Sequence, residues 1–142
     1  MRVPYETMLA EFERVLKKYG FSPERAHEAA EIFAQNSLAG VFSHGLNRFP
    51  RVVEYLRKGE IDPAAEAVCT ASFGAMERWN GQRGFGPLNA RHAIAADVAA
   101  SEPAEPGREV RCPGMGEHRS RKENMELGIP VAEEKWAEVL AM

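Results

Sequence analysis

Three helical patterns follow one another in the first 58 residues, and each is stopped by a glycine. In the first pattern, apolar residues recur at intervals of three and four, and Gly20 follows where a left-handed C-terminal cap would lie. The second pattern begins with Ser22 as N-cap and ends by Gly40, and the third runs from about Phe49 to Lys58, before Gly59. Three consecutive helices predict a bundle-like platform.

The helical period disappears after this platform. The stretch AEAVCTASFGAMERWNG at 65–81 is rich in β-formers and small residues around a Phe73-Gly74 break, which predicts a hairpin or a pair of short strands. A further helix is expected to carry Leu88 through Val98. The last residues indicate a loop, a polar stretch and a short closing helix around Trp136. The chain is therefore expected to be α+β and mainly α.

Composition limits the classes of function. The chain has 142 residues, 44% of them hydrophobic, which is enough for one domain with a core. A net charge of -3 argues against nucleic-acid and membrane partners and favours a small ligand or a protein. The charged N-terminus is neither a signal peptide nor a spanning helix. With only Cys69 and Cys112, the chain fits a reduced compartment, so we expect a cytoplasmic protein.

Several other motifs carry no chemistry of their own. GQRGFGP at 81–87 has the order G-x-x-G-x-G and precedes no G-K-[ST], so it matches neither the dinucleotide fingerprint nor a P-loop. We interpret it as a turn into the next helix. The spacing of His27, His92 and His118 makes no metal site, and a solvated role is expected for each.

The segment GVFSHGLNRFPR at 40–51 carries the residues best suited to chemistry. Reducing a carbonyl with hydride requires a proton on its oxygen, and histidine is the usual donor near neutral pH. A guanidinium can hold an oxoacid carboxylate through two parallel hydrogen bonds. His44 and Arg48 supply both groups, and Gly40 and Gly45 would let the backbone bend so that the side chains converge. The alternative is a plain helix connection in which His44 caps a carbonyl and Arg48 pairs with a surface acid.

The order of the motifs carries a resemblance to a family. SHGLNRFPR is followed by GEI, then by WNGQRGFGPLNA, and finally by RCPGMGEHRSRKENMELGIPV. This order resembles the malate/L-lactate dehydrogenase family that is unrelated to the Rossmann enzymes. The resemblance covers residues 1 to about 100 and about 108 to 142, with SHG-x-NRFPR and KEN-x-x-x-GI-x-V as its two specific motifs.

The resemblance implies an activity and a site. Members reduce 2-oxo or 2,3-diketo acids with NADH or NADPH, form homodimers, and use the histidine that matches His44 as proton donor. Ser43 and Arg48 then orient the substrate. The family's tail contacts the nicotinamide cofactor through Pro-Gly-Glu-His. The matching residues here are Pro113, Gly114, Glu117 and His118, with Met115 and Gly116 displacing the last two by two places.

One long region of the family has no counterpart in this chain. Members have a central region, between the helix ending near Ala100 and the tail, that forms most of the cofactor-binding domain. The chain thus reads as an internally deleted member that keeps a helical domain built from both chain ends, with a short hairpin. We expect residues 1–100 to form the N-terminal helical part, 101–109 a linker, and 110–142 a tail that packs on the helical part. The alternative to an enzyme is an inactive helical module for folding or dimerisation.

Overall fold

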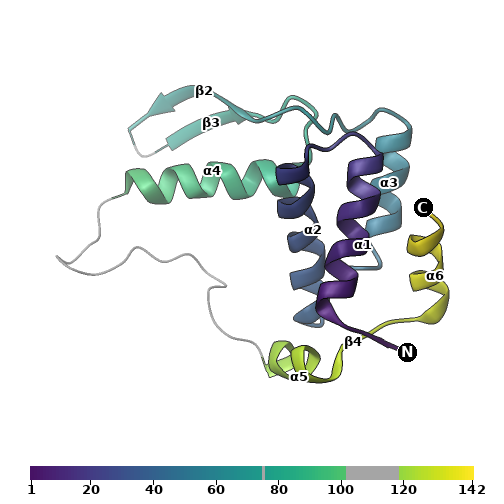
Figure 1. The fold of residues 1–142 in the computed structure, drawn as a ribbon. Helices are drawn as coiled ribbons and strands as arrows, with labels where there is room; N and C mark the ends of the chain where they lie inside the picture. The colour runs from purple at the N-terminus through teal and green to yellow at the C-terminus, as the bar shows by residue number, and fades with distance from the viewer. Residues whose placement is uncertain (75, 102–118) are drawn as a thin grey trace.

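The computed structural model describes residues 1–74, 76–101 and 119–142, and helices dominate it (Figure 1). The helices are α1 (Tyr5–Lys18), α2 (Pro23–Leu38), α3 (Phe49–Arg57), α4 (Gly86–Ala100), α5 (Arg119–Leu127) and α6 (Glu133–Ala141). The strands are β1 (Arg2–Val3), β2 (Val68–Phe73), β3 (Met76–Asn80) and β4 (Ile129–Pro130). The expected mainly helical α+β class is confirmed.

Helices α1 to α3 begin and end where the sequence signals them. Gly20 has a φ of +96°, the left-handed conformation that ends α1. The Ser22 hydroxyl accepts a hydrogen bond from the Arg25 amide at 3.3 Å, which caps α2. Pro50 lies in the first turn of α3, where a missing amide hydrogen costs nothing. The three predicted helices are therefore confirmed.

Aromatic rings fill the centre of the core. Phe12 and Phe49 stack with centroids 4.2 Å apart, and Phe33 meets Phe49 edge-on at 5.1 Å. Phe33 also stacks on Phe85, at 5.5 Å, just before α4 begins. Each such pair adds about 0.5–1.5 kcal/mol beyond the area that it buries. The aromatic cluster thus joins the first three helices and holds the start of α4.

The two ends of the described chain pack into one helical body. β1 pairs with β4 in antiparallel register, with Val3 opposite Ile129. α6 contacts α1 and α3, and it buries Trp136 and Val139. α5 contacts α2. The prediction of a domain built from both ends is confirmed, whereas the short β1–β4 pair and the helical state of the polar stretch, α5, were not predicted.

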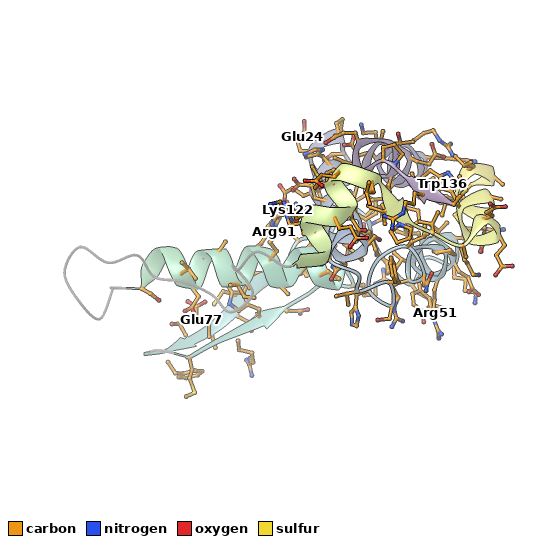
Figure 2. All side chains as sticks on the ribbon, turned by 90° about the horizontal axis from the view of Figure 1, so that it is seen from below. Glu24, Arg51, Glu77, Arg91, Lys122 and Trp136 are labelled. Atoms are coloured by element: carbon orange, nitrogen blue, oxygen red, sulfur yellow. The ribbon has the colours of Figure 1, made fainter. Side chains whose placement is uncertain are left out.

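The predicted hairpin forms, and together with α4 it extends away from the helical body (Figure 1). Figure 2 shows Glu77 on this projection, far from Trp136 and Arg51 in the body. Gly74, at a φ of +61°, makes the tight turn between β2 and β3. Large apolar side chains are exposed here, with Phe73 at 69% and Met76 at 70%.

One sequence prediction is not tested by this architecture. Only Ser101 of the expected 101–109 linker is described, so the domain boundaries stay predictions. Across residues 1–74, 76–101 and 119–142, no helix is long and apolar enough to cross a membrane.

Candidate functional site

The segment between α2 and α3 carries Ser43, His44 and Arg48, and all three side chains are exposed. The segment is a succession of tight turns. The Gly45 amide donates to the Val41 carbonyl at 3.1 Å, and the Arg48 amide donates to the Gly45 carbonyl at 3.0 Å. Chemistry-bearing side chains on an internally bonded loop between two helices can hold a fixed position while they face a ligand.

A buried serine on α2 anchors this segment. The Ser37 hydroxyl donates to the Phe33 carbonyl at 2.8 Å and accepts from the Leu46 amide at 2.9 Å. Ser37 is fully buried, and Leu46 is 1% exposed. Because the hydroxyl is used both as donor and as acceptor, no buried polar group is left unpaired at this contact.

The two glycines of the segment have different roles. Gly40 has a φ of +80°, as expected for a residue that turns the backbone after α2. Gly45 has no left-handed φ, so its own backbone conformation does not require glycine. Instead, a Cβ on Gly45 would lie 2.2 Å from the Ser37 Oγ, so only glycine lets the segment approach α2 this closely.

Of the three predicted residues, the structure joins two. The Ser43 Oγ and the His44 Nδ1 are 3.0 Å apart, which is hydrogen-bond distance. The alternative in which His44 caps a carbonyl is not seen among the described residues, and neither is an ion pair between Arg48 and an acid. No hydrogen bond joins Arg48 to His44 in the described part of the chain. The side chains of His44 and Arg48 are both exposed.

The four residues expected to contact a cofactor lie outside the described residues. These are Pro113, Gly114, Glu117 and His118. They stay predictions, and their nearest described neighbour in the sequence is α5, which begins at Arg119.

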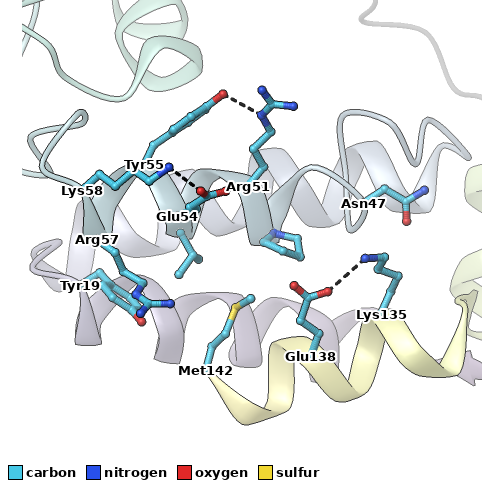
Figure 3. Close-up of a pocket in the computed structure, with 12 residues that line it drawn as sticks. Tyr19, Asn47, Arg51, Glu54, Tyr55, Arg57, Lys58, Lys135, Glu138 and Met142 are labelled. Atoms are coloured by element: carbon cyan, nitrogen blue, oxygen red, sulfur yellow. Dashed lines mark hydrogen bonds and ion pairs between the residues drawn. The ribbon is translucent and has the colours of Figure 1, made fainter.

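One hollow of the described surface is a groove of about 540 Å³ between α3 and α6 (Figure 3). Asn47 lines it, but Ser43, His44 and Arg48 do not. Its charges are mostly paired within the protein: Lys58 donates to Glu54 at 2.5 Å and Lys135 to Glu138 at 3.1 Å. The hydrogen bond from Lys58 lowers the pKa of Glu54 below its ordinary value. The groove adjoins the candidate segment but is not built around it.

A smaller hollow of about 420 Å³ lies where the hairpin meets the start of α4. Trp79 and Asn89 line it, together with Gln82 and Arg83, which have positive φ angles of 52° and 61°. The Asn89 Nδ2 donates to the Gly81 carbonyl at 3.0 Å, while its Oδ1 is buried without a partner among the described residues. This hollow is also not lined by His44.

A solvated role was expected for His27 and His92, but each of them also bridges two helices. The His27 Nδ1 on α2 lies 2.6 Å from the Glu13 carboxylate on α1, and the His92 Nε2 on α4 lies 2.8 Å from Glu28 on α2. The hydrogen bond with Glu13 raises the pKa of His27. Among residues 1–74, 76–101 and 119–142, no three His, Cys, Asp or Glu side chains are grouped to hold a metal.

The family model and the similar proteins of known name agree on one family. The malate/L-lactate dehydrogenase family matches residues 3–99. The chain is 45% identical over 102 residues to a 2,3-diketo-L-gulonate reductase of Escherichia fergusonii and 44% identical to one of Escherichia coli. Each match covers 70% of this chain but 31% of the relative.

Solved structures agree with this match. A sulfolactate dehydrogenase from Methanocaldococcus jannaschii superimposes with a TM-score of 0.66 at 28% identity, over 70% of this chain and 29% of that one. A delta1-piperideine-2-carboxylate reductase from Pseudomonas syringae has a TM-score of 0.60 at 28% identity, over 70% of this chain and 30% of that one. The chain thus spans about three tenths of the length of the relatives that it matches.

Proposed function

Because the chain belongs to the malate/L-lactate dehydrogenase family, we propose that it is the proton-donor part of an NAD(P)H-dependent reductase of 2-oxo or 2,3-diketo acids. The relatives named 2,3-diketo-L-gulonate reductase make that diketo acid the first substrate to test. The observation that carries the proposal is the Ser43–His44 hydrogen bond on an exposed segment that buried Ser37 fixes from below.

In this proposal His44 is the general acid. With Nδ1 at hydrogen-bond distance from the Ser43 hydroxyl, Nε2 is the ring nitrogen that can face a substrate. The imidazolium donates its Nε2 proton to the carbonyl oxygen as hydride reaches the carbonyl carbon, which leaves an alcohol and a neutral imidazole. Because His44 is exposed, it can take up the next proton from water.

Arg48 and Ser43 orient the reactants. Arg48 is exposed on the same segment as His44, where its guanidinium can hold the substrate carboxylate through two parallel hydrogen bonds. Ser43 fixes the imidazole ring through Nδ1 and so directs Nε2 outward. A proton donor and a carboxylate clamp four residues apart suit a short oxoacid in which the carbonyl adjoins the carboxylate.

A reduced nicotinamide would supply the hydride. The described residues fit a proton donor and an anion clamp, and neither of the two hollows described above is lined by His44. We therefore place the cofactor contacts on Pro113, Gly114, Glu117 and His118, in line with the family tail. A homodimer and a cytoplasmic location also go with this proposal.

A second function is favoured by one observation, which is that the chain spans about three tenths of the length of its relatives. In this alternative, the chain is a helical module that folds or dimerises without catalysis. The division into residues 1–100, a 101–109 linker and a packed 110–142 tail belongs to both proposals.

Titration of NADH and NADPH into the purified chain, followed by nicotinamide fluorescence, separates the two functions. The titration is made with and without 2,3-diketo-L-gulonate. Saturable binding that tightens with the diketo acid supports the reductase. Absence of binding at millimolar cofactor removes the reductase proposal and leaves the helical module.

A further inference from the structure

We infer that Asn124, on α5, is a positioning residue for the His44 segment. Its Nδ2 donates a hydrogen bond to the Leu38 carbonyl at 2.7 Å, and Asn124 is only 5% exposed. Leu38 is the last residue of α2, directly before the segment that carries the proposed acid. The catalytic part of this inference rests on the proposed function, whereas the structural part does not.

The hydrogen-bond partners of the carbonyls at the end of α2 show why Asn124 is needed there. A helix leaves its last four carbonyls without partners inside the helix. The Gly40 amide bonds to the Ser37 carbonyl at 3.1 Å and the Val41 amide to the Asn36 carbonyl at 2.8 Å, the pairing of a Schellman motif. The Ala39 amide bonds to the Gln35 carbonyl at 2.9 Å. The Leu38 carbonyl is left over, and Asn124 alone among the described residues provides its partner.

Asn124 and Ser37 hold the segment from two sides. Ser37 binds the Leu46 amide in the middle of the segment, and Asn124 fixes the helix end where the segment begins. His44 lies between these two points, so the direction of its backbone depends on both. An unpaired Leu38 carbonyl would favour conformations in which the last turn of α2 opens to water, and the start of the segment would move with it.

The position of Asn124 in the sequence gives the contact a further meaning. α5 begins at Arg119, directly after the residues proposed to contact the cofactor, and five residues later Asn124 binds α2. Helix α5 therefore follows the proposed cofactor residues in the chain, and its Asn124 binds the last residue of α2, the helix that precedes the proposed proton donor. Asn124 also belongs to KEN, the second specific motif of the tail, for which the proposed reaction provides no direct role.

Hydrogen exchange on the full chain tests the inference without needing catalysis. Asn124→Asp keeps the size of the side chain but removes the donor, because a carboxylate only accepts. We expect amides of residues 41–48 to exchange about tenfold faster near neutral pH, since a lost buried hydrogen bond changes a local equilibrium by about that factor. Amides of α1, such as Val15, should keep their rates.

Acid provides a rescue in the same variant. Below about pH 4 the aspartic acid is neutral and can again donate to the Leu38 carbonyl, so protection of 41–48 should return after correction for the intrinsic exchange rate. Glu123→Gln is the matched control, because Glu123 is the neighbour of Asn124 on α5 and its carboxylate pairs with Arg2 at 3.4 Å. It should leave exchange in 41–48 unchanged at both pH values.

The outcomes separate the two levels of the inference. Faster exchange confined to 41–48, reversed by acid, supports the positioning role. Unchanged exchange, or acceleration spread equally over α1 and the segment, overturns it. If the aspartate variant does not fold, Asn124→Ser, whose side chain is shorter, gives the exchange comparison between 41–48 and α1 without the acid reversal. Turnover is measured separately. If the wild-type chain is active, Asn124→Asp should have a lower kcat and an unchanged KM for the cofactor. If the wild-type chain is inactive, the exchange result is still valid.

Discussion

The backbone of Gly45 lies so close to α2 that a Cβ at this position would be 2.2 Å from the Ser37 Oγ and 2.8 Å from the Ser37 amide nitrogen. The same hydroxyl accepts the hydrogen bond of the Leu46 amide. Two neighbouring residues thus hold the segment that carries His44 against α2. Gly45 contacts Ser37 with no room for a side chain, and Leu46 donates a hydrogen bond to the same serine.

Replacing Gly45 with alanine should destabilise the chain by about 1–3 kcal/mol, because the new methyl group meets both a backbone atom and the serine hydroxyl. Urea unfolding followed by far-ultraviolet circular dichroism measures this change. Gly86→Ala is the control, since a Cβ at Gly86 would meet no heavy atom within 4 Å. Combining Gly45→Ala with Ser37→Ala should cost less than the sum of the two single changes, by about 1 kcal/mol, because the hydroxyl in the way is gone. Strict additivity would contradict the contact.

The His27–Glu13 pair predicts a stability difference that depends on pH. Its hydrogen bond with Glu13 raises the pKa of His27, so this stabilisation is complete below the unfolded value of about 6.5 and is lost as pH rises through the folded pKa. Hydrogen bonds from Lys17 and then His27 lower the pKa of Glu13, so its contribution is lost toward acid. The pair therefore stabilises most between about pH 4.5 and 6.5.

His27→Ala should accordingly lower the free energy of unfolding by about 0.5–1 kcal/mol near pH 5.5, and by much less near pH 8.5, because both groups are partly exposed. Urea titrations of both proteins at the two pH values measure the difference. A loss that grows toward alkaline pH would show that the pair is not the cause.

The proposed chemistry predicts different kinetic effects for changes at His44 and Arg48. His44→Gln should lower kcat by about 10²–10⁴-fold, since the proton donor is lost. Arg48→Lys should mainly raise KM for the oxoacid, by about tenfold, because an ammonium cannot make the two parallel hydrogen bonds. Steady-state oxidation of NADH measures both effects, and His92→Gln, on α4, is a control that should leave both constants unchanged. Equal rates for wild type and His44→Gln would remove His44 as the acid.

The hairpin predicts self-association. Phe73 and Met76 lie at its tip, 69% and 70% exposed, and Val68 and Ile94 are about half exposed on the same projection. Light scattering should therefore report species larger than the monomer, in amounts that rise with concentration. The double change Phe73→Glu and Met76→Glu should shift the population toward the monomer, while Leu140→Glu, on the helical body, should not. A compact wild-type monomer at all concentrations would refute the prediction.

The sequence predicts those parts of the fold in which local signals agree with packing. Apolar spacing, the Ser22 cap and the stop at Gly20 together place α1 and α2, and the Phe73-Gly74 break places the hairpin. The helix α5 was missed because RSRKENMEL has no apolar period. Its contact with α2 includes polar groups, with Asn124 on a carbonyl and Arg121 bonded to Gln35. β1 and β4 are too short, at two residues each, to leave a pattern.

The candidate site is predictable only in part for a similar reason. The types and order of Ser43, His44 and Arg48 can be read from the chain, and their exposure agrees with a ligand-facing role. The supports of the segment cannot be read in this way. Ser37 resembles any helical serine until the segment is seen to pack on it, and Gly45 is required by a distance between elements rather than by its own φ.

The bond between Asn124 and Leu38 joins residues 86 positions apart, and this spacing bears on how the protein folds during its synthesis. Helices α1 to α3 leave the ribosome early and can pack on one another, because domains form from the N-terminus as the chain emerges. The end of α2 must wait until α5 has been synthesised. A nascent chain stalled before α5 would thus have a packed aromatic core, while the segment that carries the proposed proton donor would lack the support of Asn124 at its start.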